Sequence, residues 1–131
     1  MTRHLFLSPD WFRAVQELLD RDGMPDIAAE LRDLELNVTV RDEKTGQVAE
    51  VSYRGCFFHP EPIEGAALLS TTRDLAYHVM IERNLVLGVR ALATGQAKIR
   101  GDRRRLMALR KVRSTPSQAA FEQRVREITT L

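Results

Sequence analysis

Two stretches in which apolar and polar residues alternate place the strongest constraint on the fold of this chain. Every second side chain is apolar over residues 34–40, and the same period of two recurs over residues 49–54. Successive side chains of a β-strand point to opposite faces, so each stretch predicts a strand with one buried face. The link between them is short and contains Gly46, which favours antiparallel neighbours. The chain therefore predicts a β-hairpin.

Further strands and several helices complete the expected order of elements. Short strands are predicted at residues 56–58, 66–71 and 96–100. Helices are predicted over residues 9–22, 26–32, 73–81, 85–94 and 103–112, and after Pro116, because apolar residues recur there at helical spacing or helix-start signals precede them. Hairpin-linked strands with helices in separate blocks indicate an α+β protein with a mainly antiparallel sheet, formed by one domain over residues 1–131.

The composition is that of an ordinary globular domain. Hydrophobic residues make up 44% of the chain and charged residues 29%, and no run longer than eight residues lacks Asp, Glu, Lys or Arg. A membrane-spanning helix needs about twenty apolar residues, so none is expected. The single cysteine, Cys56, excludes an intrachain disulfide and a metal site made of thiolates alone. With no long apolar run at the N-terminus, the expected location is the cytoplasm.

The positive charge of the chain is concentrated in one segment. Residues 100–113 carry seven basic side chains and one acidic side chain, whereas residues 1–99 carry 11 basic and 15 acidic ones. Such a segment would attract phosphates, so transient contact with an anionic membrane through Arg103, Arg104 and Arg105 is one interpretation. A solvated helix face is the simpler one. Nucleic acid is unlikely as a partner, because aromatic residues that could stack on bases are scarce nearby.

No group of residues in the sequence has the spacing of an active site. His4, His59 and His78 are scattered, and no two of them have metal-ligand spacing on one element. Cys56 and His59 could suggest a thiol and its base, but no third orienting group accompanies them. The glycines are isolated and form no phosphate-binding loop. We therefore expect no enzymatic activity, no catalytic residues, no metal and no cofactor.

The informative feature is instead the apolar surface of the predicted elements. A sheet covered by helices can pack fully, or it can retain a cleft between the two layers. The period of the apolar residues does not distinguish these outcomes. A packed core would suit a protein–protein interaction module or a homodimer, whereas a cleft would suit a hydrophobic ligand.

Four stretches, taken in order along the chain, form a known combination. Residues 8–12 open a helix, residues 35–53 form the hairpin, and residues 66–75 form a strand that ends in a polar cap and enters a helix. Residues 92–102 combine a helix end, a glycine, a strand and a final Gly-Asp pair. In this order the stretches resemble the sterol carrier protein type 2 family in its small stand-alone bacterial form.

The resemblance implies a five-stranded, mainly antiparallel sheet covered by helices, with an apolar tunnel between sheet and helices for a fatty acid, an acyl chain or a sterol-like lipid. The C-terminal helix can act as a lid in such proteins, and Phe121, Val125 and Ile128 would be its inner face. The candidate lining residues are Leu36, Val38, Val40, Val51, Tyr53, Leu68, Val89, Leu92, Ile99, Leu106, Leu109, Phe121 and Val125.

The chain also departs from this family in two places. Residues 60–64 replace the usual acidic run before the fourth strand, and the arginines at 103–105 make the segment after Gly101 unusually basic. The expected function is non-enzymatic binding or carriage of a hydrophobic ligand. The alternatives are a protein–protein or homodimer module with a packed core, and nucleic-acid binding through residues 100–113. The sequence leaves open whether the protein is a monomer or a homodimer.

Overall fold

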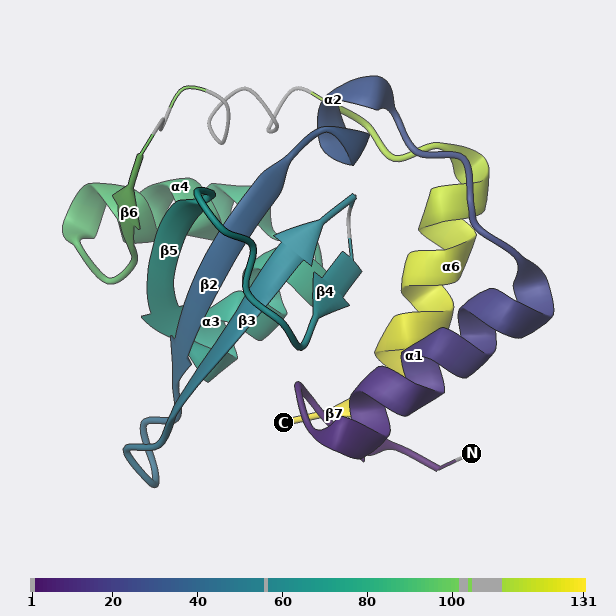
Figure 1. The fold of residues 1–131 in the computed structure, drawn as a ribbon, viewed down its shortest axis with the longest axis horizontal. Helices are drawn as coiled ribbons and strands as arrows, with labels where there is room; N and C mark the ends of the chain where they lie inside the picture. The colour runs from purple at the N-terminus through teal and green to yellow at the C-terminus, as the bar shows by residue number, and fades with distance from the viewer. Residues whose placement is uncertain (1, 56, 102–103, 105–111) are drawn as a thin grey trace.

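The fold is built around the predicted hairpin, which lies inside a five-stranded sheet (Figure 1). The structure is a computed structural model that describes residues 2–55, 57–101, 104 and 112–131. The strands of the sheet are β2 (Glu35–Arg41), β3 (Val48–Arg54), β4 (Phe57–His59), β5 (Ala67–Thr72) and β6 (Lys98–Arg100). They lie side by side in the order β4-β3-β2-β5-β6. The α+β class and the hairpin are therefore confirmed.

The sheet is mixed, which corrects the expectation of a mainly antiparallel one. Strands β2 and β3 are antiparallel, with Val38 opposite Val51, and β4 and β6 are also antiparallel to their neighbours. Strands β2 and β5 run parallel, with Val38 beside Leu69. A parallel pair needs a connection that returns across the sheet. The local pattern of residues 66–71 predicts a strand there but carries no information on its direction.

The returning connection is residues 60–66, which cross one face of the sheet in front of β3 and β2 (Figure 1). The Asn37 side chain holds this segment, because its Nδ2 donates to the Ile63 carbonyl at 2.6 Å and its Oδ1 accepts from the Ile63 amide at 2.7 Å. The Ser52 hydroxyl donates to the Glu61 carbonyl at 2.6 Å. Two polar residues on the outer face of the hairpin thus fix the path of the crossover.

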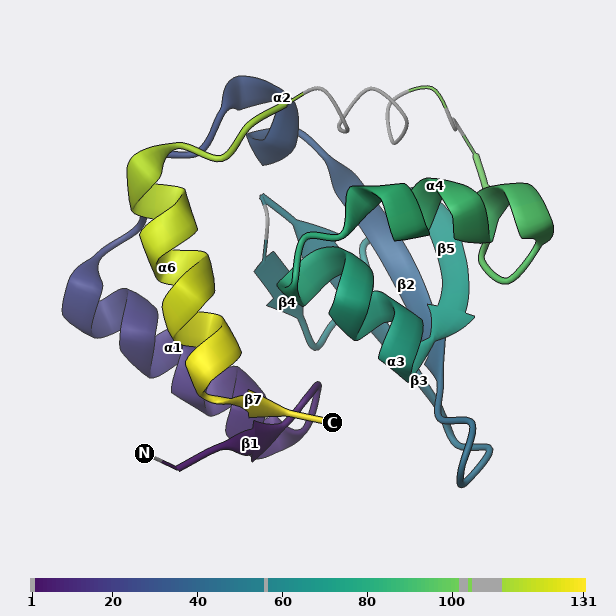
Figure 2. The same ribbon diagram turned by 180° about the vertical axis from the view of Figure 1, so that it is seen from behind.

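The opposite face of the sheet is covered by helices (Figure 2). Helix α3 (Arg73–Ala76) continues into a π-helix, η1 (Tyr77–Ile81), and α4 (Leu85–Thr94) follows. Helices α1 (Pro9–Asp22) and α6 (Pro116–Glu127) lie side by side beyond β4, and α2 (Ala29–Arg32) precedes β2. An ion pair of 3.3 Å between Arg124 and Asp22 joins α6 to α1. The expected helix over residues 103–112 lies outside the described residues, except Arg104 and Val112.

Hydroxyl side chains cap the N-termini of three of these helices. Ser8 Oγ accepts from the Trp11 amide at 3.2 Å at the start of α1, Thr72 Oγ1 caps α3, and Thr115 Oγ1 caps α6. The predicted helix over residues 73–81 is not one regular α-helix. Its second half is η1, in which the Glu82 amide donates to the Tyr77 carbonyl at 3.1 Å. The predicted helix over residues 26–32 shortens to Ala29–Arg32.

The core lies between the sheet and the helices. Leu36, Val38 and Val40 of β2 are 2%, 0% and 2% exposed, because they alternate onto the helix-covered face. An aromatic cluster extends this core to α1. Phe6 makes edge-to-face contacts with Trp11 and Phe58 at centroid distances of 5.2 and 5.4 Å, an arrangement that aromatic quadrupoles favour.

The two ends of the chain meet in a small second sheet that the sequence analysis did not predict. Strand β1 (His4–Leu5) pairs in parallel with β7 (Thr129–Thr130). Beneath it the Trp11 indole Nε1 donates to Thr129 Oγ1 at 2.8 Å, and both residues are at most 2% exposed. Thr129 also donates to the Val125 carbonyl in α6. One buried hydroxyl therefore connects the start of α1 to the end of α6.

Removing that hydroxyl is expected to destabilise the fold. Thr129→Val keeps the shape of the side chain but leaves the Trp11 indole N–H buried without its acceptor. We expect the free energy of unfolding to fall by about 1–3 kcal/mol, measured by urea denaturation. Thr130→Val is the matched control, because Thr130 is exposed, and it should change stability by less than about 0.5 kcal/mol. Equal effects of the two substitutions would contradict the role of the buried bond.

His59 at the end of β4 gives the stability a pH dependence. Burial, and then the charge of Arg54, lower the pKa of His59 below its ordinary value of 6.5. The unfolded chain therefore binds a proton more readily than the folded one as the pH falls through about 6.5, which favours unfolding. We expect the free energy of unfolding to drop between about pH 7.5 and pH 5.5, and to drop less in His59→Gln. Parallel pH profiles of the two proteins would refute this.

Candidate ligand-binding site

An apolar cavity of about 90 Å³ lies between the sheet and its covering helices. The sheet side of the wall consists of Leu34, Tyr53, Leu69 and Thr71. The helix side consists of Leu75, Ala76, Val79, Met80, Leu85, Gly88, Val89, Ala91 and Leu92, and the wall is completed by Leu31, Arg83 and Ala97. The cavity therefore occupies the layer in which a tunnel is expected from the sequence, although the residues that the structure describes show no continuous tunnel.

Small residues on the helices create this space. Ala76 and Ala91 on the helices are 3% and 0% exposed, and Ala97, which directly precedes β6, is 6% exposed, so short side chains stand at buried positions where longer ones would fill the layer. Gly88 lets α4 approach η1, because a Cβ atom there would lie 3.0 Å from Cγ1 of Val79. The helices thus lie close to each other while their small side chains leave room toward the sheet.

A second cavity of about 40 Å³ lies toward α1 and α6. Its wall is largely aromatic, and it includes the inner face of α6. The lining residues are Trp11, Val15, Tyr53, Phe57, Phe58, Met80, Ile81, Phe121, Glu122 and Val125. Tyr53 and Met80 line both cavities, so the two spaces are neighbours that both border these side chains.

Eleven of the thirteen candidate lining residues fall into three groups. Tyr53, Val89 and Leu92 line the first cavity, and Tyr53, Phe121 and Val125 line the second. The second group is buried without lining either cavity, and consists of Leu36, Val38, Val40 and Val51. The third group consists of Leu106 and Leu109, which lie outside the described residues.

Leu68 and Ile99 line neither cavity. Leu68 is beside Asn37 in the register of β2 and β5, so its side chain belongs to the outer face of the sheet. Ile99 is opposite Leu69 on the inner face, but in the short edge strand β6. Ile128, expected on the inner face of the last helix, is 8% exposed and belongs to the core.

Most of the helix-side wall was missed as a site, although its residues were recognised as apolar. Leu75, Val79 and Met80 lie within the helix predicted over residues 73–81, but they are not among the candidate lining residues. The available signal was the frequency of alanine and glycine at buried helix positions, such as Gly88 and Ala91. Large apolar residues predict where a core forms, whereas small ones indicate where it is left incomplete.

One charged pair stands at the boundary of the two cavities. Arg83 lines the first and Glu122 the second, and Nε of Arg83 is 3.7 Å from Oε1 of Glu122. Arg83 follows η1 with a left-handed backbone, φ 59°, which turns the chain into α4. The Glu122 carboxylate also accepts from Gln118 Nε2 at 3.0 Å and from the Ser114 hydroxyl at 3.2 Å. Glu122 therefore keeps hydrogen-bond donors that are independent of Arg83.

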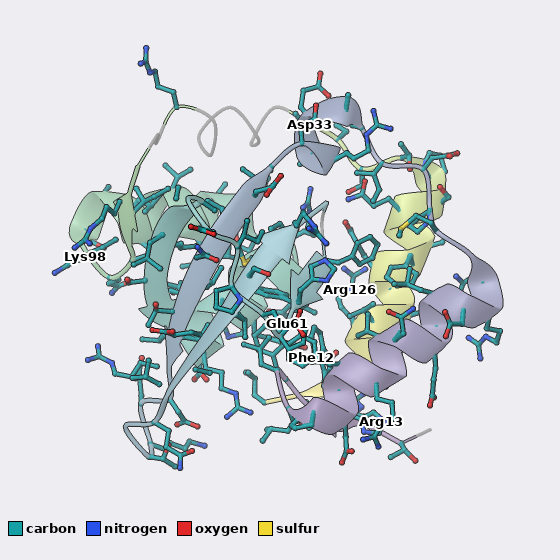
Figure 3. The ribbon with its side chains drawn as sticks, in the orientation of Figure 1. Phe12, Arg13, Asp33, Glu61, Lys98 and Arg126 are labelled. Carbon is teal, nitrogen blue, oxygen red and sulfur yellow. The ribbon has the colours of Figure 1, made fainter. Side chains whose placement is uncertain are left out.

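Arg126 adds a second link between α6 and the cavity wall. Its Nη1 donates to the Ile81 carbonyl at the end of η1, at 3.2 Å, and Figure 3 labels this side chain between α6 and the sheet. The basic residue Lys98 lies in β6, at the opposite end of the sheet from α1 and α6 (Figure 3). Of the arginines proposed for membrane contact, Arg104 is exposed, whereas Arg103 and Arg105 lie outside the described residues.

Metal-ligating side chains do not cluster within the described part of the chain. There, no group of three or more His, Cys, Asp or Glu side chains could hold a metal ion. His78 pairs through Nδ1 with the Glu82 carboxylate on an exposed turn of η1. Cys56 lies outside the described residues. No helix in the described ranges has the length and hydrophobicity needed to cross a bilayer.

Comparisons with protein families, with curated proteins and with solved structures find no match to this chain. The sterol carrier resemblance therefore depends on the four stretches quoted above.

Proposed function

We propose that this protein binds a hydrophobic or amphipathic lipid without chemically altering it, and carries it between the sheet and the helices. The observation that carries the proposal is the apolar cavity of about 90 Å³ in that layer. Its wall is apolar except for Tyr53, Thr71 and Arg83, which is typical of a site that recognises a chain by burial and an end group by few polar contacts. The resemblance to the sterol carrier protein type 2 family supports the same proposal.

The energetics suit a carrier. Each methylene that leaves water contributes about 0.8 kcal/mol, so a palmitate-sized chain would contribute roughly 11–12 kcal/mol before costs. Ordering the chain and losing its free motion cost several kcal/mol. A dissociation constant in the micromolar range is therefore expected. Such a ligand is held during diffusion and is still released on arrival.

The cavity must expand to take a long chain. An apolar cavity of about 150 Å³ holds a single benzene ring, and the space here is about 90 Å³. We expect the helix-side wall to move outward when the cavity expands. Helix α3 and η1 are only four and five residues long, and Val89 and Leu92 of α4 are only half-buried. The sheet side is held by ladder hydrogen bonds on both flanks of β2.

The proposal extends to the setting in which the protein acts. We place it in the cytoplasm as a member of the sterol carrier protein type 2 family. Transient contact with an anionic membrane would be made by the basic segment of residues 100–113, in which seven basic residues outnumber one acidic residue. The contact would weaken as salt is raised, because exposed charges are screened.

The modest size of the cavity favours one alternative, a protein–protein or homodimer module with a closed core. A lipid carrier is expected to purify with a bound lipid, whereas an interaction module with a closed core is not. Native mass spectrometry of gently purified protein is expected to show a bound lipid, and displacement of a fluorescent fatty acid to occur at micromolar concentration. A ligand-free protein with no displacement, and a dimer in sedimentation, would support the interaction module instead.

A blocking substitution tests the site directly. Val89→Trp places a large side chain in the cavity wall, and Val86→Trp places the same side chain on the same helix at a position that is 71% exposed. We expect Val89→Trp to weaken binding of a fluorescent fatty acid by about tenfold or more, and Val86→Trp to leave it within about twofold. Circular dichroism checks that both variants fold. Equal affinities of the two variants would place the ligand elsewhere.

The polar group in the wall predicts a preference for an anionic end group. Arg83 has a single charged neighbour among the described residues, Glu122, at a distance longer than a hydrogen bond. We expect Arg83→Gln to weaken palmitate binding by about tenfold, or 1.4 kcal/mol, and to spare the alcohol of the same chain length. Arg90→Gln is the control, because Arg90 is exposed on α4. An equal loss for acid and alcohol would show that Arg83 contributes only to structure.

A further inference from the structure

We propose that Met80 is a movable partition between the two cavities, and that its side chain sets how long a ligand chain the protein accepts. This inference rests on the proposed lipid-binding function and adds a specificity determinant to it. A short chain would occupy the first cavity alone. A longer chain would displace Met80 and continue into the second cavity, toward Phe57 and Phe121.

The position of η1 carries the proposal. Val79 lines the first cavity, Ile81 lines the second, and Met80 between them lines both. Figure 2 shows the helix formed by α3 and η1 between α4 on one side and α6 on the other. Three consecutive residues of one helical turn therefore span the boundary between the spaces. A single π-helical turn of this kind is uncommon and often lies at a functional site.

Met80 is the mobile member of the pair that separates the cavities. The other member, Tyr53, is 6% exposed, lies within β3, and makes an edge-to-face contact with Phe58 at 5.1 Å. Met80 is half-buried, and its unbranched side chain has three rotatable bonds and a polarizable sulfur. Rotating Met80 leaves the ladder hydrogen bonds of the sheet intact. Displacing Tyr53 would disturb the aromatic cluster.

The volumes of the two cavities predict how the affinity depends on the length of the ligand chain. Spaces of about 90 and 40 Å³ are each too small for a long acyl chain, so binding one requires that they join and that the helix-side wall also moves outward. Both are lined mainly by apolar side chains, so each further methylene that enters the second cavity should tighten binding by up to about fourfold. The gain should end when the chain reaches the far wall formed by the aromatic residues.

The experiment compares chain length against the size of residue 80. Saturated fatty acids from octanoate to stearate are titrated against a bound fluorescent fatty acid, with wild type, Met80→Phe and Met80→Ala. We expect Met80→Phe to bind octanoate within about twofold of wild type and to lose about tenfold or more for palmitate. Met80→Ala should increase the gain from octanoate to palmitate, because no side chain has to be displaced. Met24→Phe is the control at a position 68% exposed.

A second measurement does not depend on any substitution. In protein labelled at the methionine methyl groups, palmitate is expected to shift the Met80 signal strongly and octanoate to shift it little, while the exposed Met24 signal stays in place. Chain-length profiles that run parallel in all variants, or a Met80 signal that palmitate leaves unmoved, would overturn the partition and leave lipid binding standing. Failure of every fatty acid to bind wild type would instead refute the proposed function itself.

Discussion

The inner face of β2 is the interaction on which the rest of the structure depends. Leu36, Val38 and Val40 are almost completely buried, and the strand that carries them is bonded to β3 on one side and to β5 on the other. A shift of register by one residue would turn all three side chains to the outer face. It would also turn Asn37 inward, away from the crossing segment that it holds. The period of two in this strand therefore determines both which face the helices cover and where the crossover runs.

The elements that sequence predicted are those whose signals are local. The alternation of residues 34–40 and 49–54, and the capping hydroxyls of Ser8, Thr72 and Thr115, each act within a few residues. The expectation of a mainly antiparallel sheet was wrong because β2 pairs in parallel with β5, and the direction of β5 depends on a crossover held by bonds between residues 26 positions apart. Strands β1 and β7 were missed because two residues carry no period, and their pairing depends on the meeting of the chain ends.

The candidate site was only partly predictable for a related physical reason. Large apolar side chains on the strands are expected to line the tunnel, but at the centre of the sheet they pack tightly, as the 0% exposure of Val38 shows. Empty volume is left where side chains are short, at Ala76 and Ala91 on the helices. Leu68 was assigned to the wall although the odd–even alternation of its strand places it on the outer face.

The two walls of the cavity differ in how they can respond to a ligand. The sheet wall is fixed by backbone hydrogen bonds on both sides of β2, whereas the helix wall consists of short segments joined through η1. The helix wall also contacts α6. Arg126 of α6 donates to the Ile81 carbonyl, and Arg83 forms an ion pair with Glu122 of α6. Expansion of the cavity must therefore either move α6 together with η1 or break these contacts. Since Arg124 of α6 is in turn paired with Asp22 of α1, the proposed entry of a ligand would be coupled to the arrangement of both terminal helices.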